Sequence, residues 1–260
     1  MSIKEFFGFG GYERAAEGYF SWQHLLFVSI LNVLMIASAV ILGKKLKNKD
    51  DNRKNKVLVY AAIALNAFEI FKIILLSFRQ QNALHILYNL PLFLCSIQLI
   101  TLPLAAFSKG RLKEAALDFV TIFGPLGAVI GTYFAGNNYS VYPVISFDNV
   151  VSGITHTLAG FAALYILFSG MAFMNKRNIY ITLTILGGFC VAAYIANIFL
   201  DCNYMFLSRG DGTPYDIVYN WVDGHVLFYP LIVVGLFIVY IFLFYFCFNL
   251  IKKRRNINKK

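Results

Sequence analysis

The sequence predicts an all-α, polytopic membrane protein with seven transmembrane helices, an N-terminus outside and a C-terminus in the cytoplasm. Of its 260 residues, 59% are hydrophobic and only 14% are charged, and the mean hydropathy is +0.65. A soluble domain of this length needs far less apolar surface. The apolar residues also gather into runs of about 20, the helical length that crosses a hydrocarbon core about 30 Å thick. We therefore expect a multi-pass protein of the cell membrane.

The runs divide the chain into three regions. Residues 1–22 are rich in aromatic side chains and glycine and lack a signal-peptide pattern, so they predict an interfacial segment at the outer surface. Residues 23–251 form the expected transmembrane domain, and residues 252–260 form a basic cytoplasmic tail. The seven expected helices cover residues 23–43, 57–78, 88–107, 117–136, 150–174, 179–200 and 224–251.

The distribution of basic residues predicts the orientation. Eighteen of the 23 Lys and Arg residues lie in the segments that follow the first, third, fifth and seventh runs, and only four lie in the opposite segments. Cytoplasmic loops carry the excess of Lys and Arg, which places the C-terminus inside. The net charge of +10 is therefore a topology signal, and we expect membrane lipids rather than nucleic acid as partners.

The first two runs already carry polar side chains near their outer ends. His24 opens the first run, and Glu69 and Lys72 lie three residues apart on one face of the second. A charge near a helix centre costs roughly 2.5–3.5 kcal/mol on insertion scales. Two interpretations remain open: an intrahelical ion pair with Lys72 snorkelling outward, or a role for both residues in a polar cavity.

The third and fourth runs contribute a thiol and a packing surface. Pro91, Cys95 and Gln98 fall on one face of a helix over residues 88–107, with Cys95 about 10 Å below the outer end. A lone Cys in such a helix is most often a small hydrophobe. The fourth run contains Gly124, Gly127 and Gly131, and small residues of this kind let neighbouring helices approach closely.

The fifth run carries His156, the residue on which the functional prediction depends. An imidazole inside a membrane span usually faces a bundle interior or a wet cavity. Its depth matches that of Cys95, and the alternative is a histidine satisfied by one neighbouring helix. The sixth run ends near Asn197 and is followed by Asn203. The face that carries His156 is polar and small over three turns, with Asn149, Ser152, Gly153, His156 and Gly160.

These polar groups share one depth. All four histidines lie in the outer third, whereas the inner halves of the helices are almost free of polar side chains. This pattern predicts a polar cavity that opens toward the outer side. A channel needs polar groups along its whole depth, so conduction is disfavoured.

Missing motifs exclude several chemistries. The chain has no His-x4-Asp, Gly-x-Ser-x-Gly, His-Glu-x-x-His or Cys-x-x-Cys motif and no phosphate-binding glycine loop. The seventh run lacks the lysine that a retinal protein requires, and no two of the four cysteines are placed for a disulfide. We expect neither a metal nor a cofactor.

What remains is a Cys–His pair with chemistry suited to acyl groups. An imidazole can take the thiol proton, and the thiolate can attack an ester to give a thioester. Gln98, Asn197 or Asn203 would supply oxyanion donors, and Glu69 would orient His156. The competing hypothesis is a non-catalytic protein that binds a lipid or small solute, as a transporter or sensor.

Short motifs along nearly the whole chain resemble the YwaF-like integral membrane family of bacteria. They are Gln23-His24-Leu25, Asn66-x-x-Glu69, Leu90-Pro-Leu-Phe-Leu-Cys95-Ser96, His156 and Asn203-Tyr-Met-Phe-Leu207. The family is similar to a eukaryotic transmembrane acyltransferase that places polyunsaturated chains on ether phospholipids, and more distantly to threonine–histidine membrane hydrolases of fatty-acid esters. The resemblance implies that His156 is the general base and that a residue of the third helix is the nucleophile acting on an acyl lipid.

The nucleophile position departs from that transferase. Its cysteine directly follows the proline of the third helix, whereas Leu92 and Phe93 follow Pro91 here. Two interpretations follow: Cys95 is a substitute nucleophile, or the bacterial proteins are not acyltransferases.

Overall fold

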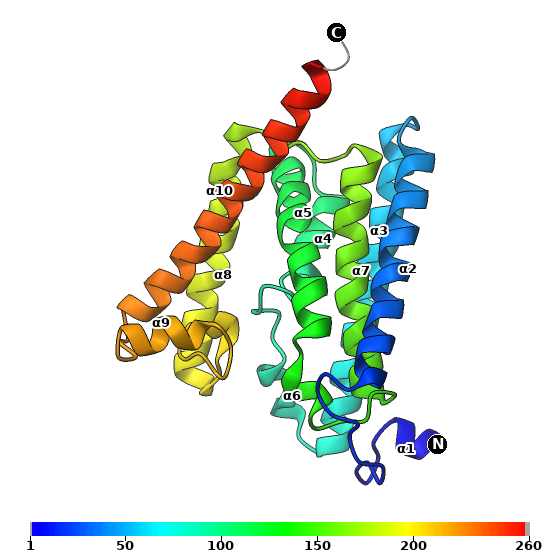
Figure 1. Ribbon diagram of the computed structural model, residues 1–260, viewed down its shortest axis with the longest axis vertical. Helices are drawn as coiled ribbons and strands as arrows, with labels where there is room; N and C mark the ends of the chain where they lie inside the picture. The colour runs from blue at the N-terminus through cyan, green and yellow to red at the C-terminus, as the bar shows by residue number, and fades with distance from the viewer. Residues whose placement is uncertain (1, 258–260) are drawn as a thin grey trace.

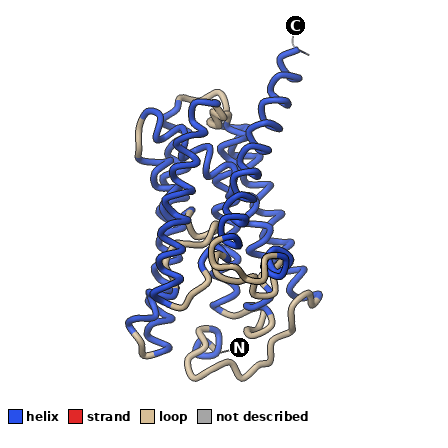
Figure 2. Tube along the Cα trace, turned by 90° about the vertical axis from the view of Figure 1, so that its left-hand side faces the viewer, coloured by secondary structure: helices blue, strands red, loops and turns tan. Residues whose placement is uncertain are grey.

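The computed structural model describes residues 2–257, which fold entirely into helices and connecting loops (Figures 1 and 2). Among these residues, six helices are long and apolar enough to cross a membrane. The expectation of an all-helical, multi-pass membrane protein is therefore confirmed. The six are α2 (Trp22–Leu46), α3 (Asp51–Gln80), α5 (Gly110–Tyr133), α7 (Phe147–Ser169), α8 (Ile179–Leu200) and α10 (Phe228–Ile257).

Local sequence signals set the ends of these helices. Ser21, Asp50 and Ser146 accept a backbone N–H at the starts of α2, α3 and α7. Gly170 ends α7 in the left-handed conformation that glycine adopts without strain. Seven shorter elements connect the spans: α1 (Ile3–Phe6), η1 (Ala83–Tyr88), α4 (Gln98–Phe107), α6 (Gly136–Tyr139), η2 (Lys176–Asn178), η3 (Tyr204–Phe206) and α9 (Tyr215–Trp221).

The third predicted helix, over residues 88–107, is wrong in its outer half. Only α4 is helical there, and residues 89–97 are irregular. Pro91 disfavours the helical conformation of Leu90, the residue before it. Consequently Pro91, Cys95 and Gln98 do not share one helical face as expected. Where seven long helices were expected, the described residues thus contain six, together with one broken segment made of residues 89–97 and the short helix α4.

Asparagine side chains of α3 bind backbone carbonyls of α4, the helical half of this broken segment. Pro103 lies inside α4 and has no N–H for the carbonyl of Leu99. The amide of Asn66 on α3 donates to that carbonyl at 3.2 Å. At the other end of α4, the amide of Asn55 donates to the Ala106 carbonyl at 2.8 Å. Irregular backbone at membrane depth is tolerated only where protein supplies such partners.

The two ends of the bundle differ in charge (Figure 1). The connections α2–α3, α4–α5 and α7–α8 and the end of α10 lie at one end, and they carry the basic clusters. The N-terminal segment, η1, α6 and α9 lie at the other end. The predicted basic tail continues α10 as far as Ile257, and its remaining residues, 258–260, lie outside the described part of the chain.

The described residues form two large apolar clusters and a small one. The first joins α2, α3, α4, α5 and α7, and the second joins α5, α8, η3, α10 and the segment before α4. The small cluster contains Val28, Tyr139 and Val144. Asp118 of α5 is a buried acid in the basic half, which the sequence predicted to be almost free of polar groups. It accepts hydrogen bonds from Tyr245 at 2.9 Å and from the backbone of Met174 at 2.9 Å, so it anchors the connection between α7 and α8.

Candidate functional site

A cavity of about 230 Å³ lies between α3, α7, α6 and the broken segment, in the half of the bundle that holds the N-terminus. Its depth and one-sided position agree with the polar cavity expected from the sequence. Four predicted site residues line it, and the other four do not. The lining residues are Leu65, Glu69, Lys72, Tyr88, Asn89, Leu90, Phe93, Cys95, Ser96, Leu99, Asn138, Ser152, Thr155 and His156.

Cys95 and His156 meet in this cavity. The thiol and the imidazole both line it, and they pack one helical turn apart against Gly127 and Gly131 of α5. Cys95 lies just before the first turn of α4. Sequence reasoning predicted the pairing from depth alone, and the irregular segment is what brings the thiol to the imidazole.

The ring of His156 is oriented by its own helix. Its Nδ1 lies 2.7 Å from the carbonyl oxygen of Ser152, which can only accept a hydrogen bond. Nδ1 therefore carries a proton and donates it to this carbonyl, which leaves Nε2 as the nitrogen that can accept the thiol proton. Glu69 does not take the orienting role that the sequence suggested for it.

Two glycines of α5 make room for the pair. A Cβ at Gly131 would overlap the His156 ring, and a Cβ at Gly127 would come within 3.3 Å of Cys95. The two glycines are one helical turn apart, so the bare backbone of α5 forms one wall behind both groups. The sequence identified these glycines as packing residues but not the residues packed against them.

Glu69 and Lys72 form an ion pair and also line the cavity. Lys72 Nζ lies 2.5 Å from Glu69 Oε1, and both side chains are largely buried. The structure therefore combines features of the two interpretations drawn from the sequence. The two residues form an intrahelical ion pair, and both also face a polar cavity. This arrangement avoids the cost of a lone charge at membrane depth.

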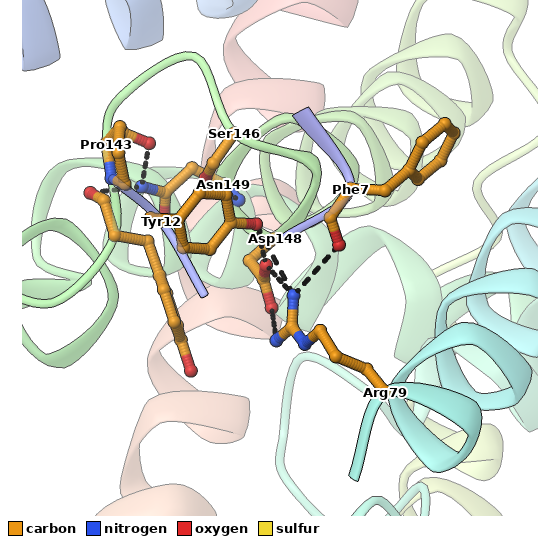
Figure 3. Close-up of polar contacts among 8 residues, drawn as sticks. Phe7, Tyr12, Arg79, Pro143, Ser146, Asp148 and Asn149 are labelled. Carbon is orange, nitrogen blue, oxygen red and sulfur yellow. Dashed lines mark hydrogen bonds and ion pairs between the residues drawn. The ribbon is translucent and has the colours of Figure 1, made fainter. Parts of the chain in front are cut away.

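Beyond the cavity lining, a buried ion pair joins α3 and α7 (Figure 3). Arg79 binds Asp148 with both guanidinium nitrogens, at 2.7 and 2.8 Å. On α3, Arg79 continues the helical face that carries Glu69 and Lys72, about 10 Å beyond Lys72 at 1.5 Å per residue. On α7, Asp148 precedes Ser152 by one turn. The pair thus joins the two cavity walls at their ends.

The N-terminal segment docks on this ion pair. The hydroxyl of Tyr12 donates to Asp148, and Arg79 donates to the carbonyl of Phe7 at 3.3 Å (Figure 3). Burial, together with the hydrogen bond to Asp148, raises the pKa of Tyr12 to about 12. The phenol therefore stays a protonated donor throughout the physiological pH range. The predicted interfacial segment at residues 1–22 thus packs on the bundle, except that residue 1 lies outside the described residues.

Four predicted site residues lie outside the cavity lining and have structural contacts. His24 is fully buried, accepts from the N–H of Phe20 at 3.2 Å and lies 3.0 Å from the carbonyl of Thr132. The carbonyl of Gln98 accepts from Thr101 at 3.1 Å. Asn197 and Asn203 bind backbone groups in and after η3. Thus the predicted amide donors Gln98, Asn197 and Asn203 do not line the site.

Sequence reasoning missed several lining residues. Ser96 follows Cys95 directly, and Thr155 lies beside His156 on the polar face already recognised. That adjacency was an available signal. Asn89 and Asn138 come from loops whose approach to the cavity depends on the fold. No group of three or more His, Cys, Asp or Glu side chains suited to a metal ion occurs within the described ranges.

The model of the TMEM164 family matches residues 19–254, which include the six long helices almost in full and every residue that lines the cavity. No curated protein and no solved structure matches the sequence.

Proposed function

The chain belongs to the TMEM164 family of transmembrane proteins, and from this premise we propose that it transfers or hydrolyses acyl groups of membrane lipids through a Cys95–His156 pair. The observation that carries the proposal is that one cavity holds this thiol and an imidazole whose Nδ1 is already bound to the Ser152 carbonyl. The Leu90–Ser96 motif and His156 resemble the YwaF-like family, which is similar to a membrane acyltransferase, and this supports the same chemistry with Cys95 as a substitute nucleophile.

In the first step, His156 Nε2 takes the proton of the Cys95 thiol and the sulfur attacks the carbonyl carbon of an ester. The C=O double bond becomes a single bond to an oxyanion. The backbone N–H groups of Cys95 and Ser96, at the nucleophile and directly after it, would stabilise that oxyanion. They replace the amide side chains predicted from the sequence.

In the second step, the carbonyl re-forms and the bond to the alcohol oxygen breaks. His156 returns its proton to the departing alcohol, and an acyl thioester on Cys95 remains. A hydroxyl of an acceptor lipid, or water, then gives its proton to His156 and attacks the thioester. Collapse releases the new ester or the acid and restores the thiol, so atoms and charge balance over the cycle.

The position of the cavity supports an acyl lipid of the outer leaflet as the substrate. The basic connections lie at the opposite end of the bundle, and such segments face the cytoplasm. With that orientation the cavity lies in the outer half of the membrane. The Glu69–Lys72 pair would then contact the polar part of the lipid.

Mass spectrometry of the purified protein tests the proposal. The protein is incubated with mixed phospholipids, and acyl adducts on Cys95 and lysolipid release are measured for the wild type, Cys95→Ala and His156→Ala. We expect both signals in the wild type and neither in the two variants. Cys247→Ala is the matched control, because that thiol is exposed and outside the cavity.

The same measurement addresses the competing function. A charged, partly enclosed cavity is equally suited to binding a lipid or a small solute without chemistry. Lipid that copurifies equally with all variants, with no adduct and no lysolipid, would rule out acyl transfer and favour a binding protein.

A further inference from the structure

The phenol of Tyr204 holds the chain that leads to Cys95. Tyr204 is buried in η3, and its hydroxyl donates to the carbonyl of Leu87 at 2.8 Å. The same oxygen accepts from the N–H of Leu90 at 3.2 Å. One hydroxyl thus satisfies a backbone donor and a backbone acceptor at the start of the irregular segment. We propose that Tyr204 is a positioning residue for the Cys95 nucleophile, an inference that rests on the proposed function.

Tyr204 is itself fixed by an asparagine. The carbonyl of Asn197 accepts from the N–H of Tyr204 at 2.6 Å, and its amide donates to the carbonyl of Tyr204 at 3.0 Å. Both backbone groups of Tyr204 are therefore bound by a single side chain. This contact holds η3 against the end of α8 and orients the phenol toward Leu87 and Leu90.

Asn203 organises the turn that follows. Its carbonyl accepts from the N–H of Ser208 at 3.0 Å, and its amide donates to the carbonyl of Arg209 at 2.7 Å. These bonds support a strained turn, since Met205 and Phe206 adopt positive φ angles of 55° and 56°. Asn197 and Asn203, which the sequence placed in the site, thus act on it from a distance through Tyr204.

A short path connects Leu90 to the thiol. The N–H of Leu92 donates to the carbonyl of Leu90 at 2.8 Å, and the ring of Phe93 packs 5.1 Å from that of Tyr204. Ser96 Oγ accepts from the N–H of Phe93 at 3.0 Å. Residues 89–97 lack a continuous helical ladder, so these few contacts determine where Cys95 lies. A shift of Leu90 would therefore alter the approach of the thiol to His156.

The test measures the reactivity of Cys95 rather than acyl transfer. The full-length protein is alkylated with a small neutral maleimide across a pH series, and the rate at Cys95 is followed by peptide mass spectrometry. A thiol paired with an imidazole reacts faster near neutral pH than an isolated one. For Tyr204→Phe we expect a loss of about tenfold in this rate and a pH profile displaced toward that of His156→Ala.

Tyr229→Phe is the matched control. Tyr229 is a buried tyrosine of the same apolar cluster, and its hydroxyl has no hydrogen-bond partner among the residues that the structure describes. Removing that hydroxyl should leave the pH profile unchanged. Asn197→Ala provides a second variant: it frees the backbone of Tyr204, keeps the phenol, and should shift the profile in the same direction even if Tyr204→Phe does not fold.

The outcomes separate the two proposals. If His156→Ala changes the profile but Tyr204→Phe and Asn197→Ala match the wild type, the positioning role is wrong and the Cys–His pair stands. If His156→Ala itself leaves the profile unchanged, the pair is not coupled and both proposals fail.

Discussion

The position of His156 depends on Gly131 of the facing helix α5, which has no side chain. A methyl group at Gly131 would occupy the space of the imidazole ring, whereas Gly187 on α8 has no heavy atom within 4 Å of the corresponding position. Gly131→Ala should therefore displace His156. An error of about 1 Å in such a group costs on the order of a hundredfold in rate.

The measurement is the rate of acyl-adduct formation on Cys95 in the Gly131→Ala and Gly187→Ala proteins. Gly187→Ala should react at the wild-type rate. Equal rates in both variants would mean that the imidazole has no part in the reaction.

The Arg79–Asp148 pair should contribute strongly to stability. Both side chains are largely buried, with exposed fractions of 13% and 9%, so Arg79→Gln leaves a carboxylate in a poorly solvated place. Removing one partner of a buried pair costs about 3 kcal/mol or more. The exposed Arg209–Asp211 pair is the control, and Arg209→Gln should cost about 1 kcal/mol at most. Thermal unfolding in detergent compares the two; a similar loss in both would contradict the assignment.

Residue-level prediction from the sequence selected two residues that line the same cavity, but not the groups that hold them there. Cys95 and His156 were identified because polar side chains are rare at membrane depth. The orienting group of His156 is the carbonyl of Ser152, and every residue has a carbonyl, so no side-chain pattern marks it. Asn197 was assigned to the cavity on depth alone, whereas its partner is the backbone of Tyr204, which only the fold brings there.

At the scale of elements, hydropathy identified the third apolar run but did not predict that its first half is irregular. Residues 88–107 form an apolar run, and an average over a window cannot distinguish a helix from irregular chain packed inside a bundle. The sequence placed Pro91 on one face of a continuous helix. The interruption depends instead on partners from other elements, such as Tyr204 for the N–H of Leu90.

The N-terminal segment should limit the access of water to the cavity. Tyr12 joins this segment to the ion pair at the end of the cavity walls, so Tyr12→Phe should loosen it. We expect a charged methanethiosulfonate reagent to modify Cys95 several-fold faster in this variant, and a neutral lipid-soluble maleimide to react at an unchanged rate. Tyr60→Phe is the control, since Tyr60 is exposed on α3. A charged reagent that reacts equally in both variants would show that the segment is no barrier.

At the scale of the whole molecule, the orientation can be tested by labelling in intact cells. The two ends of the chain lie at opposite ends of the bundle (Figure 1). In a Cys202→Ala background, an impermeant maleimide should label Asp211→Cys from outside, and Lys49→Cys only after permeabilisation. The reverse pattern would move the cavity to the inner leaflet.

The sequence was most informative at this largest scale. The all-helical, multi-pass architecture follows from the apolar runs, and the separation of the basic connections from the cavity follows from the positions of Lys and Arg. How the helices surround one another does not, because lipid-facing and protein-facing sides are both apolar. Asp118 illustrates this limit: its partners Tyr245 and Met174 lie far away in the chain.

The broken third crossing also constrains how the protein is made. Residues 89–97 expose backbone groups that lipid cannot satisfy, so they cannot settle in the bilayer when they first emerge. Tyr204, which binds both Leu87 and Leu90, is synthesised 117 residues after Leu87. The segment that carries Cys95 therefore reaches its final position only after α8 has been inserted. On the proposed function, an unfinished chain would hold an inert thiol, and the reactive group would form only once η3 has packed against residues 87–90.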